Sequence, residues 1–185
     1  MSESTTMNGS VGSARAAGAS ARSTLFAAFG IAAIVFVLDQ LSKVWAENTL
    51  DHNVAEPLIG DIVQLRLIYN SGAAFGLGGS ITPIITGVQI GIAIAVIVVL
   101  VRSVRSYAWM VSLSLLLGGA LGNIVDRLFR APGPLTGHVV DFLELPHWPI
   151  FNVADIAVTT GAVLLVVLTL ANVPLDPRDK SEVRA

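Results

Sequence analysis

Four aspartates lie in or beside long apolar stretches of the sequence, where an ionised carboxyl is costly. They are Asp39, Asp126, Asp141 and Asp155. A charged side chain at the centre of a spanning helix costs roughly 3 kcal/mol on insertion scales, so it usually has a partner or a function. Lys43 follows Asp39 by four residues, a spacing that makes helical side chains neighbours. Arg127 and Arg130 follow Asp126 closely. These cations predict that Asp39 and Asp126 form structural ion pairs.

The other two aspartates, Asp141 and Asp155, have no lysine or arginine nearby in the sequence, and His138 is the nearest basic group to Asp141. Asp155 is expected about two turns into the last apolar segment from Trp148, or roughly 10 Å along a helix. Two carboxyls that meet in a poorly hydrated site share one proton. One can then take a proton from water while the other protonates a leaving amine. For Asp155 alone, a polar plug hydrogen-bonded to another helix is the alternative.

Amide side chains are expected near the same depth, at Asn70, Asn123 and Asn152. Each can donate a hydrogen bond to a carboxylate or to a substrate carbonyl. Singly, each is more typical of a loop or a helix cap, but their shared depth predicts a common site. Small residues at Gly118, Gly119 and Gly122 favour close helix packing over any chemical role.

The composition indicates the elements that position these residues. Of the 185 residues, 54% are hydrophobic and only 13% are charged, against about 25% charged in soluble domains. The net charge of -2 gives no indication of a nucleic-acid partner. The absence of cysteine excludes a thiolate nucleophile and a disulfide framework.

Four apolar blocks, each near the roughly 20 residues that a spanning helix needs, predict an all-α membrane protein with four transmembrane helices. They cover residues 25–45, 81–101, 107–125 and 148–173. We expect one membrane domain over residues 23–173, a disordered tail rich in Ser, Ala and Gly over residues 1–22, and a charged tail over residues 174–185.

Basic residues near the ends of these blocks predict the orientation. They place both termini and the short second connection in the cytoplasm, and the longer connections 46–80 and 126–147 outside. Alternating apolar residues over 63–69 predict a strand, and 138–142 a second, so a small extracytoplasmic β-sheet is expected. Glycines 72, 76, 78 and 79 predict a flexible approach to the second helix.

Five ordered sequence blocks resemble the signature of bacterial lipoprotein signal peptidase, or signal peptidase type II. They are DQ and K within 39–43, NSGAAF at 70–75, GGALGNIVDR at 118–127, VVDF at 139–142 and FNVAD at 151–155. The resemblance implies a membrane aspartyl endopeptidase that needs no metal or cofactor. It would remove the signal peptide from diacylglyceryl-modified prolipoproteins by cutting before the lipidated cysteine.

The resemblance also implies roles for individual residues. The catalytic pair corresponds to Asp141 and Asp155, and Asp39, Lys43 and Asp126 look like structural support. The substrate-binding positions correspond to Asn70, Gly72, Asn123, Arg127 and Asn152. The family acts in the bacterial cytoplasmic membrane, in contact with its lipids, and is inhibited by the cyclic peptide globomycin. We expect a monomer with its active site near the outer face.

Three alternatives stay open on the sequence alone. Ser71 or Ser42 could act as a nucleophile with Lys43 as base. A metal could bind a set formed by His138, Asp141 and His147. A proton-coupled membrane transporter or channel subunit would use intramembrane carboxylates to relay protons.

Overall fold

The computed structural model of the chain describes residues 6–72 and 81–176, with side chains from residue 23 onward. Its helices are α1 (Thr6–Thr49), α2 (Thr82–Arg102), α3 (Tyr107–Phe129) and α4 (Val153–Leu170). Each contains a stretch long and apolar enough to cross a membrane. The four predicted spanning helices are therefore confirmed. The predicted glycine-rich approach to α2 lies mostly outside the described residues, as does most of the predicted C-terminal tail.

Helix α3 is the centre of the bundle. Its apolar stretch is 56% buried inside the protein, whereas the stretches of the other three helices are 17–22% buried and leave most of their surface for lipid. Lipid offers no hydrophobic drive for helix association, so close backbone approach matters instead. A Cβ added at Gly118 would meet the backbone of Ala32 in α1, and one at Gly119 would meet Ala154 in α4. The predicted packing role of these glycines is confirmed.

Helix α4 begins later than the sequence indicated, at Val153 instead of 148. Trp148 precedes Pro149, and a residue before proline is disfavoured in helical conformation. Asn152 is then the N-cap residue. Asp155 consequently lies in the first turn of α4, and the prediction that it lies two turns inside the helix was wrong.

Helix α1 begins at Thr6, so it overlaps most of the segment that composition predicts to be a disordered tail. Residues 14–21 are rich in alanine, which has the highest helix propensity. A helix that continues an existing spanning helix also avoids the cost of nucleation. Helix propensity and continuity with the spanning helix therefore account for this difference.

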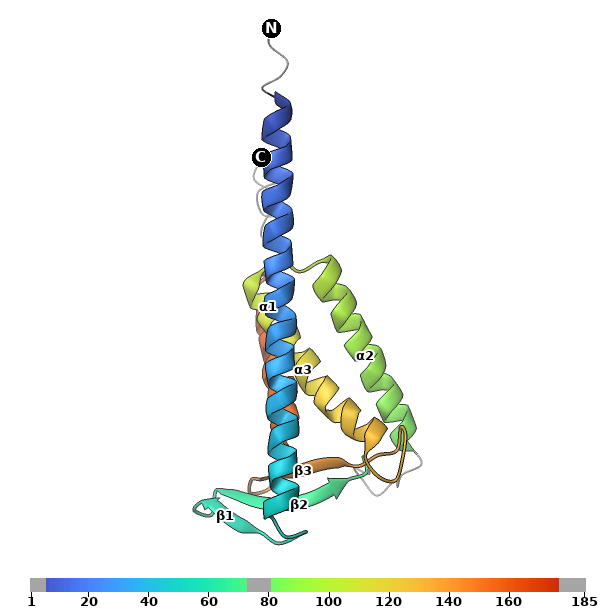
Figure 1. Cartoon of the computed structure of the whole chain (residues 1–185). Coiled ribbons are helices and arrows are strands. Elements are labelled where there is room, and N and C mark those ends of the chain that lie inside the picture. The colour runs from blue at the N-terminus through green and yellow to red at the C-terminus, as the bar shows by residue number, and fades with distance from the viewer. Residues whose placement is uncertain (1–5, 73–80, 177–185) are drawn as a thin grey trace.

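A three-stranded antiparallel sheet lies across one end of the bundle, at the end of α1 and the start of α2 (Figure 1). Its strands are β1 (Glu56–Ile59), β2 (Val63–Asn70) and β3 (Val139–Glu144), in the order β1-β2-β3. The strands predicted at 63–69 and 138–142 are confirmed. Strand β1 was not predicted, because it is short, fully exposed and contains Pro57, which is typical of edge strands.

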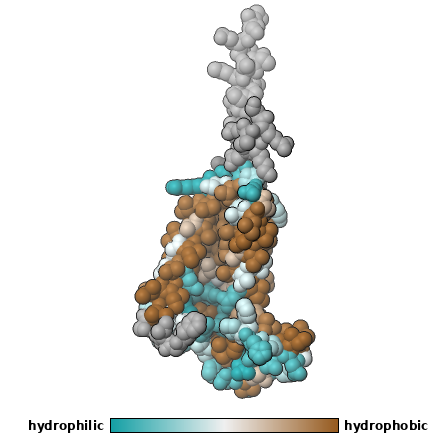
Figure 2. All heavy atoms as spheres, turned by 180° about the vertical axis from the view of Figure 1, so that it is seen from behind, coloured by the Kyte–Doolittle hydropathy of each residue, from teal (hydrophilic) through white to brown (hydrophobic). Residues whose placement is uncertain are grey.

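An apolar cluster attaches the sheet to the bundle. Leu65 and Leu67 of β2 and Val140 and Phe142 of β3 are buried together with the end of α1. Figure 2 shows the result from behind: brown apolar surface covers the helices, and a hydrophilic area opens between them on the side of the sheet. The sheet is therefore fixed next to this hydrophilic area.

Candidate active site

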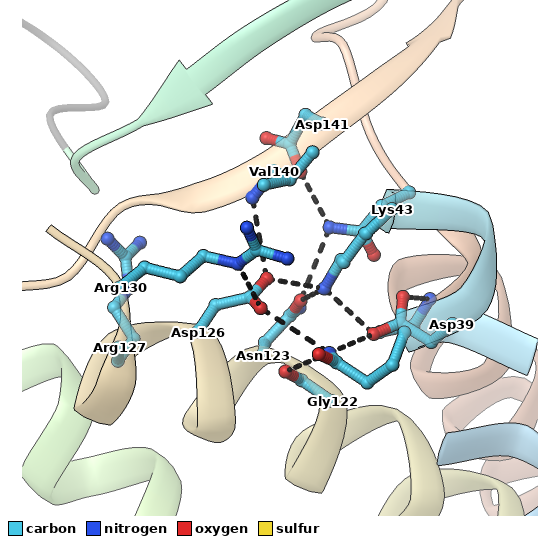
Figure 3. Close-up of polar contacts among 12 residues, drawn as sticks. Asp39, Lys43, Gly122, Asn123, Asp126, Arg127, Arg130, Val140 and Asp141 are labelled. Atoms are coloured by element: carbon cyan, nitrogen blue, oxygen red, sulfur yellow. Dashed lines mark hydrogen bonds and ion pairs between the residues drawn. The ribbon is translucent and has the colours of Figure 1, made fainter. Parts of the chain in front are cut away.

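A fully buried lysine holds helices α1 and α3 together (Figure 3). The Nζ of Lys43 in α1 lies 2.8 Å from Asp39 Oδ2, 2.7 Å from Asp126 Oδ2 and 2.9 Å from Asn123 Oδ1. An ammonium group has three hydrogen-bond donors, so this set satisfies it completely. The second of these carboxylates has a further cation beside it, because Arg130 Nε lies 2.8 Å from Asp126 Oδ1. The predicted ion pairs of Asp39 and Asp126 are confirmed.

Asp39 and Asp126 also accept hydrogen bonds from the backbone beside Asp155 and Asp141, respectively. The N–H of Ala154, the residue before Asp155, donates to Asp39 Oδ1 at 2.8 Å. The N–H of Val140, the residue before Asp141, donates to Asp126 Oδ2 at 3.4 Å. Lys43 binds the carboxylates of both Asp39 and Asp126. This one buried cation therefore helps to position both Asp155 and Asp141.

Asp141 is buried in β3, and sheet register places Asn70 beside it. Ile68 is paired with Asp141 and Asn70 with Val139, so Asn70 and Asp141 share one face of the sheet as diagonal neighbours. Asn70 Nδ2 donates to Asp141 Oδ2 at 2.8 Å. The other end of this amide accepts from the backbone N–H of Gly72, also at 2.8 Å. Gly72 has a φ of 81°, a conformation that favours glycine, and so it fixes the orientation of Asn70.

Asp155 is held by the first turn of α4 and by α3. Its Oδ2 accepts from the Asn152 N–H at 3.2 Å, while Asn152 Oδ1 accepts from the Asp155 N–H at 3.0 Å, which is a capping box. Its other oxygen, Oδ1, accepts from Asn123 Nδ2 at 2.9 Å. Within residues 23–72 and 81–176, the carboxyl group is therefore positioned without an ion pair.

Asn152 brings the two aspartates into one hydrogen-bonded network. Its Nδ2 donates to Asp141 Oδ1 at 2.6 Å and to Asn123 Oδ1 at 3.2 Å. Asn123 in turn donates to Asp155. The structure thus brings together all three predicted asparagines and the two aspartates, from β2, β3, α3 and the start of α4.

The surroundings of Asp141 favour its protonated form. Burial raises the pKa of Asp141 to about 7, against the opposing effect of its hydrogen bond from Asn70, and the negative charge of Asp155 raises it further. The contribution from Asp155 shows that the two carboxyls interact electrostatically. A pair of this kind can hold a single proton near neutral pH.

Arg127 contacts the site mainly through the backbone. Its Nη1 donates to the carbonyl of Asn70 at 2.8 Å and to that of Gly137 at 3.0 Å. A Cβ added at Gly72 would lie 3.1 Å from its Nη2. Within the described part of the chain, Arg127 Nε is buried and has no hydrogen-bond partner. Arg127 therefore fixes the end of β2 that carries Asn70.

Two cavities reach Asp155 at the level of the membrane helices. One, of about 230 Å³, is lined by Trp148, Phe151, Ile156, Thr159 and Thr160 as well as Asp155. The other, of about 140 Å³, lies among α2, α3 and α4 and also includes Asn123. Asp155 is thus accessible from the apolar side of the protein.

The geometry does not favour the alternative chemistries. Ser42 Oγ donates to the carbonyl of Asp39 in its own helix at 2.8 Å, and the ammonium of Lys43 is already bound by two carboxylates. Lys43 is therefore not placed to act as a base. Across the residues that the structure describes, no group of three His, Asp or Glu side chains is arranged to hold a metal ion.

Sequence reasoning assigned no role to two further polar residues in this network. Gln40 Nε2 donates to Asp39 Oδ2 and to the Gly122 carbonyl, both at 3.1 Å. Glu47 pairs with Arg130 at 2.5 Å. These two partners are 83 residues apart in the sequence, so no spacing within one helix indicated their pairing.

Solved structures with a similar fold indicate the class of protein. One, described as a bacterial membrane enzyme structure at 1.9 Å resolution, has a TM-score of 0.70 and 30% sequence identity, and the match covers 78% of this chain and 92% of that one. A second bacterial membrane enzyme structure, at 2.3 Å, has a TM-score of 0.70 and 29% identity, and covers 79% of this chain and 88% of that one. Fold and site together define a multi-pass membrane enzyme with a pair of acids, one buried and one half-buried, in a network of amides.

The sequence comparisons give the family. Residues 31–171 match the family described as signal peptidase (SPase) II. The lipoprotein signal peptidase of Rhodococcus jostii is 49% identical over 148 residues, which are 80% of this chain and 74% of that protein. That of Mycobacterium avium is 47% identical over 146 residues, or 79% and 80% of the two chains. The chain belongs to the signal peptidase II family, and it is a peptidase that removes signal peptides from prolipoproteins.

Proposed function

We propose that Asp141 and Asp155 are the catalytic residues of an aspartic endopeptidase that cuts diacylglyceryl-modified prolipoproteins before the lipidated cysteine. The observation that carries this proposal is the network in which Asn152 and Asn123 join two carboxyls that form no ion pair among the described side chains. Asp39 and Asp126, by contrast, are both ion-paired to Lys43. The four aspartates therefore divide into a supporting pair and a reactive pair.

The chemistry follows from one proton shared between two carboxyls. The ionised carboxylate takes a proton from a water molecule, whose oxygen attacks the scissile carbonyl carbon. The protonated partner donates to the carbonyl oxygen, and the leaving amine takes a proton as the carbon–nitrogen bond breaks. The products are a signal peptide with a free carboxylate and a lipoprotein with a free amino group on its lipidated cysteine.

Substrate would reach the pair laterally from the bilayer. The two cavities beside Asp155 open among apolar residues of the helices, and exposed Trp148 borders one of them. Asn70, Gly72, Asn123, Arg127 and Asn152 are the proposed substrate-binding residues. Of these, Asn70, Asn123 and Asn152 touch the reactive carboxyls directly, and Arg127 acts on them by fixing β2.

The orientation in the membrane belongs to the same proposal. With the sheet and the site at the outer face, both termini lie in the cytoplasm of a bacterial cell and the protein acts as a monomer in contact with membrane lipids. Globomycin would occupy the cleft at the acid pair and inhibit cleavage.

A reconstituted cleavage assay tests the proposal. The purified full-length protein in lipid vesicles should convert a diacylglyceryl-modified precursor into a product whose first residue, by mass spectrometry, is the lipidated cysteine. Globomycin should stop this conversion, and the same precursor without lipid should stay intact. Cleavage at another bond, or equal cleavage of the unlipidated precursor, would contradict the proposed specificity.

A further inference from the structure

One polar side chain on the inner face of α2 has a buried oxygen without a partner. The inner face of this helix is marked by the buried residues Thr82, Thr86, Ala93, Val96 and Leu100. Gln89 falls between them at spacings of three and four residues, which places it on the same face. Within the described residues, Gln89 Oε1 is buried and accepts no hydrogen bond.

The neighbouring polar residues on this face are satisfied. Thr82 Oγ1 donates to the carbonyl of Ser71 at 2.5 Å, and Thr86 Oγ1 donates to the carbonyl of Leu135 at 2.9 Å. Gln89 lies about two turns into α2, in a helix without a charged residue before Arg102. A buried polar atom without a partner is costly, and in membrane helices such residues usually have a function.

Gln89 lines the cavity that leads to Asp155. This cavity of about 140 Å³ has apolar walls from α2, α3 and α4, and Asn123 and Asp155 lie at its polar end. Its other residues include Ala93, Leu116, Ala120 and Val158. A space of this size admits one apolar side chain or small ring. Gln89 therefore shares a cavity with one of the two proposed catalytic groups.

The chemistry of the amide distinguishes between possible occupants. A lipid acyl chain has no hydrogen-bond donor and would leave Gln89 Oε1 unsatisfied. A peptide that is extended for cleavage loses its internal helical hydrogen bonds, and its N–H groups then need acceptors because the surrounding hydrocarbon supplies none. A side-chain amide offers both a donor and an acceptor to a peptide unit.

We infer that Gln89 is a positioning residue that binds the main chain of the extended substrate segment just before the cleaved bond, while an apolar side chain of that segment fills the cavity. This inference rests on the proposed function. It adds a contact on α2 to a site otherwise built from the sheet, α3 and α4.

The test compares variants and substrates in the vesicle assay with the full-length protein. Gln89→Met keeps the length of the side chain and removes the amide, and we expect it to lower kcat/KM about tenfold, the effect of one hydrogen bond. Val88→Met introduces the same residue at the adjacent exposed position and should leave kcat/KM unchanged. Thermal unfolding of both variants should match that of the unmodified protein.

Ester substitution in the substrate separates positioning from a structural effect. In three ester substrates, oxygen replaces the backbone N–H of the second, third or fourth residue before the cleaved bond. For one of these substrates, kcat/KM of the unmodified protein should fall about tenfold. The Gln89→Met protein should have the same kcat/KM on that ester substrate as on the ordinary peptide substrate. The inference would be overturned if Gln89→Met had the kcat/KM of the unmodified protein. It would also be overturned if every ester substitution lowered kcat/KM equally for Gln89→Met and for the unmodified protein. Failure of the unmodified protein to cut any lipidated precursor would instead refute the proposed function.

Discussion

At the level of single residues, burial raises the pKa of Asp141 and the amide side chains of Asn70 and Asn152 lower it. The net effect, with burial as the largest cause and the negative charge of Asp155 as a smaller one, raises the pKa of Asp141 to about 7. Because cleavage needs one proton on the pair, kcat/KM should fall as the pH rises through about 7. A pH–rate profile with a lipidated precursor measures this limb.

Replacing Asn70 by alanine should change the pH at which kcat/KM falls on the alkaline side of the profile. The hydrogen bond from Asn70 lowers the pKa of Asp141, so its removal raises that pKa further. Asn70→Ala should therefore move the alkaline limb to higher pH while also lowering the maximal rate. Asn48→Ala, which removes an exposed amide that donates to the Val44 carbonyl of its own helix, should leave the limb in place. A shift of the limb to lower pH in Asn70→Ala would contradict the assigned role.

The residue types and spacings predicted much of the site. The absence of local cations separated Asp141 and Asp155 from Asp39 and Asp126, and the structure shows that division in its ion pairs. The sharing of Lys43 between Asp39 and Asp126 could not be predicted, because it joins α1 to α3 across 83 positions of sequence. Sequence spacing identifies neighbours within one helix and gives no distances between helices.

At the level of elements, close approach of α1 and α3 sets the position of Asp39. A Cβ at Gly122 would collide with the carboxylate of Asp39, which holds the first turn of α4 through Ala154. Gly122→Ala should therefore destabilise the bundle by about 1–3 kcal/mol, as overpacking does, and reduce cleavage. Thermal unfolding in detergent measures the first effect.

Gly87 is the matched control for this substitution. It lies in α2, and a Cβ added there would have no atom of the described residues within 4 Å. Gly87→Ala should keep activity and leave the unfolding temperature unchanged or slightly raised, because alanine is the better helix former. Equal destabilisation by both substitutions would show that the contact between α3 and Asp39 has no special importance.

Element boundaries were less predictable than element identities. Hydropathy indicated an apolar run from Trp148, but the helix starts at Val153 because Asn152 caps it. This difference moves Asp155 into the first turn, where its own carboxylate takes part in the capping box. The cap was present in the sequence as Asn152 three residues before Asp155, a spacing that a search for caps would have detected.

At the level of the whole molecule, the proposed orientation can be tested because the chain has no cysteine. Single cysteines at exposed Asp61, between β1 and β2, and at exposed Ser103, between α2 and α3, lie at opposite ends of the bundle. A membrane-impermeant maleimide should label Asp61→Cys in intact cells, and Ser103→Cys only after permeabilisation. The reverse pattern would place the site at the cytoplasmic face.

Asp141 and Asp155 are, in the proposed mechanism, the two groups that carry out hydrolysis. The direct measurement is the cleavage rate of a lipidated precursor by Asp141→Asn and Asp155→Asn proteins that are inserted in vesicles and have normal thermal unfolding. We predict that each rate falls by at least about a thousandfold, since neither amide can hold the shared proton. Cleavage by either variant within about tenfold of the unmodified rate would contradict the two-aspartate mechanism.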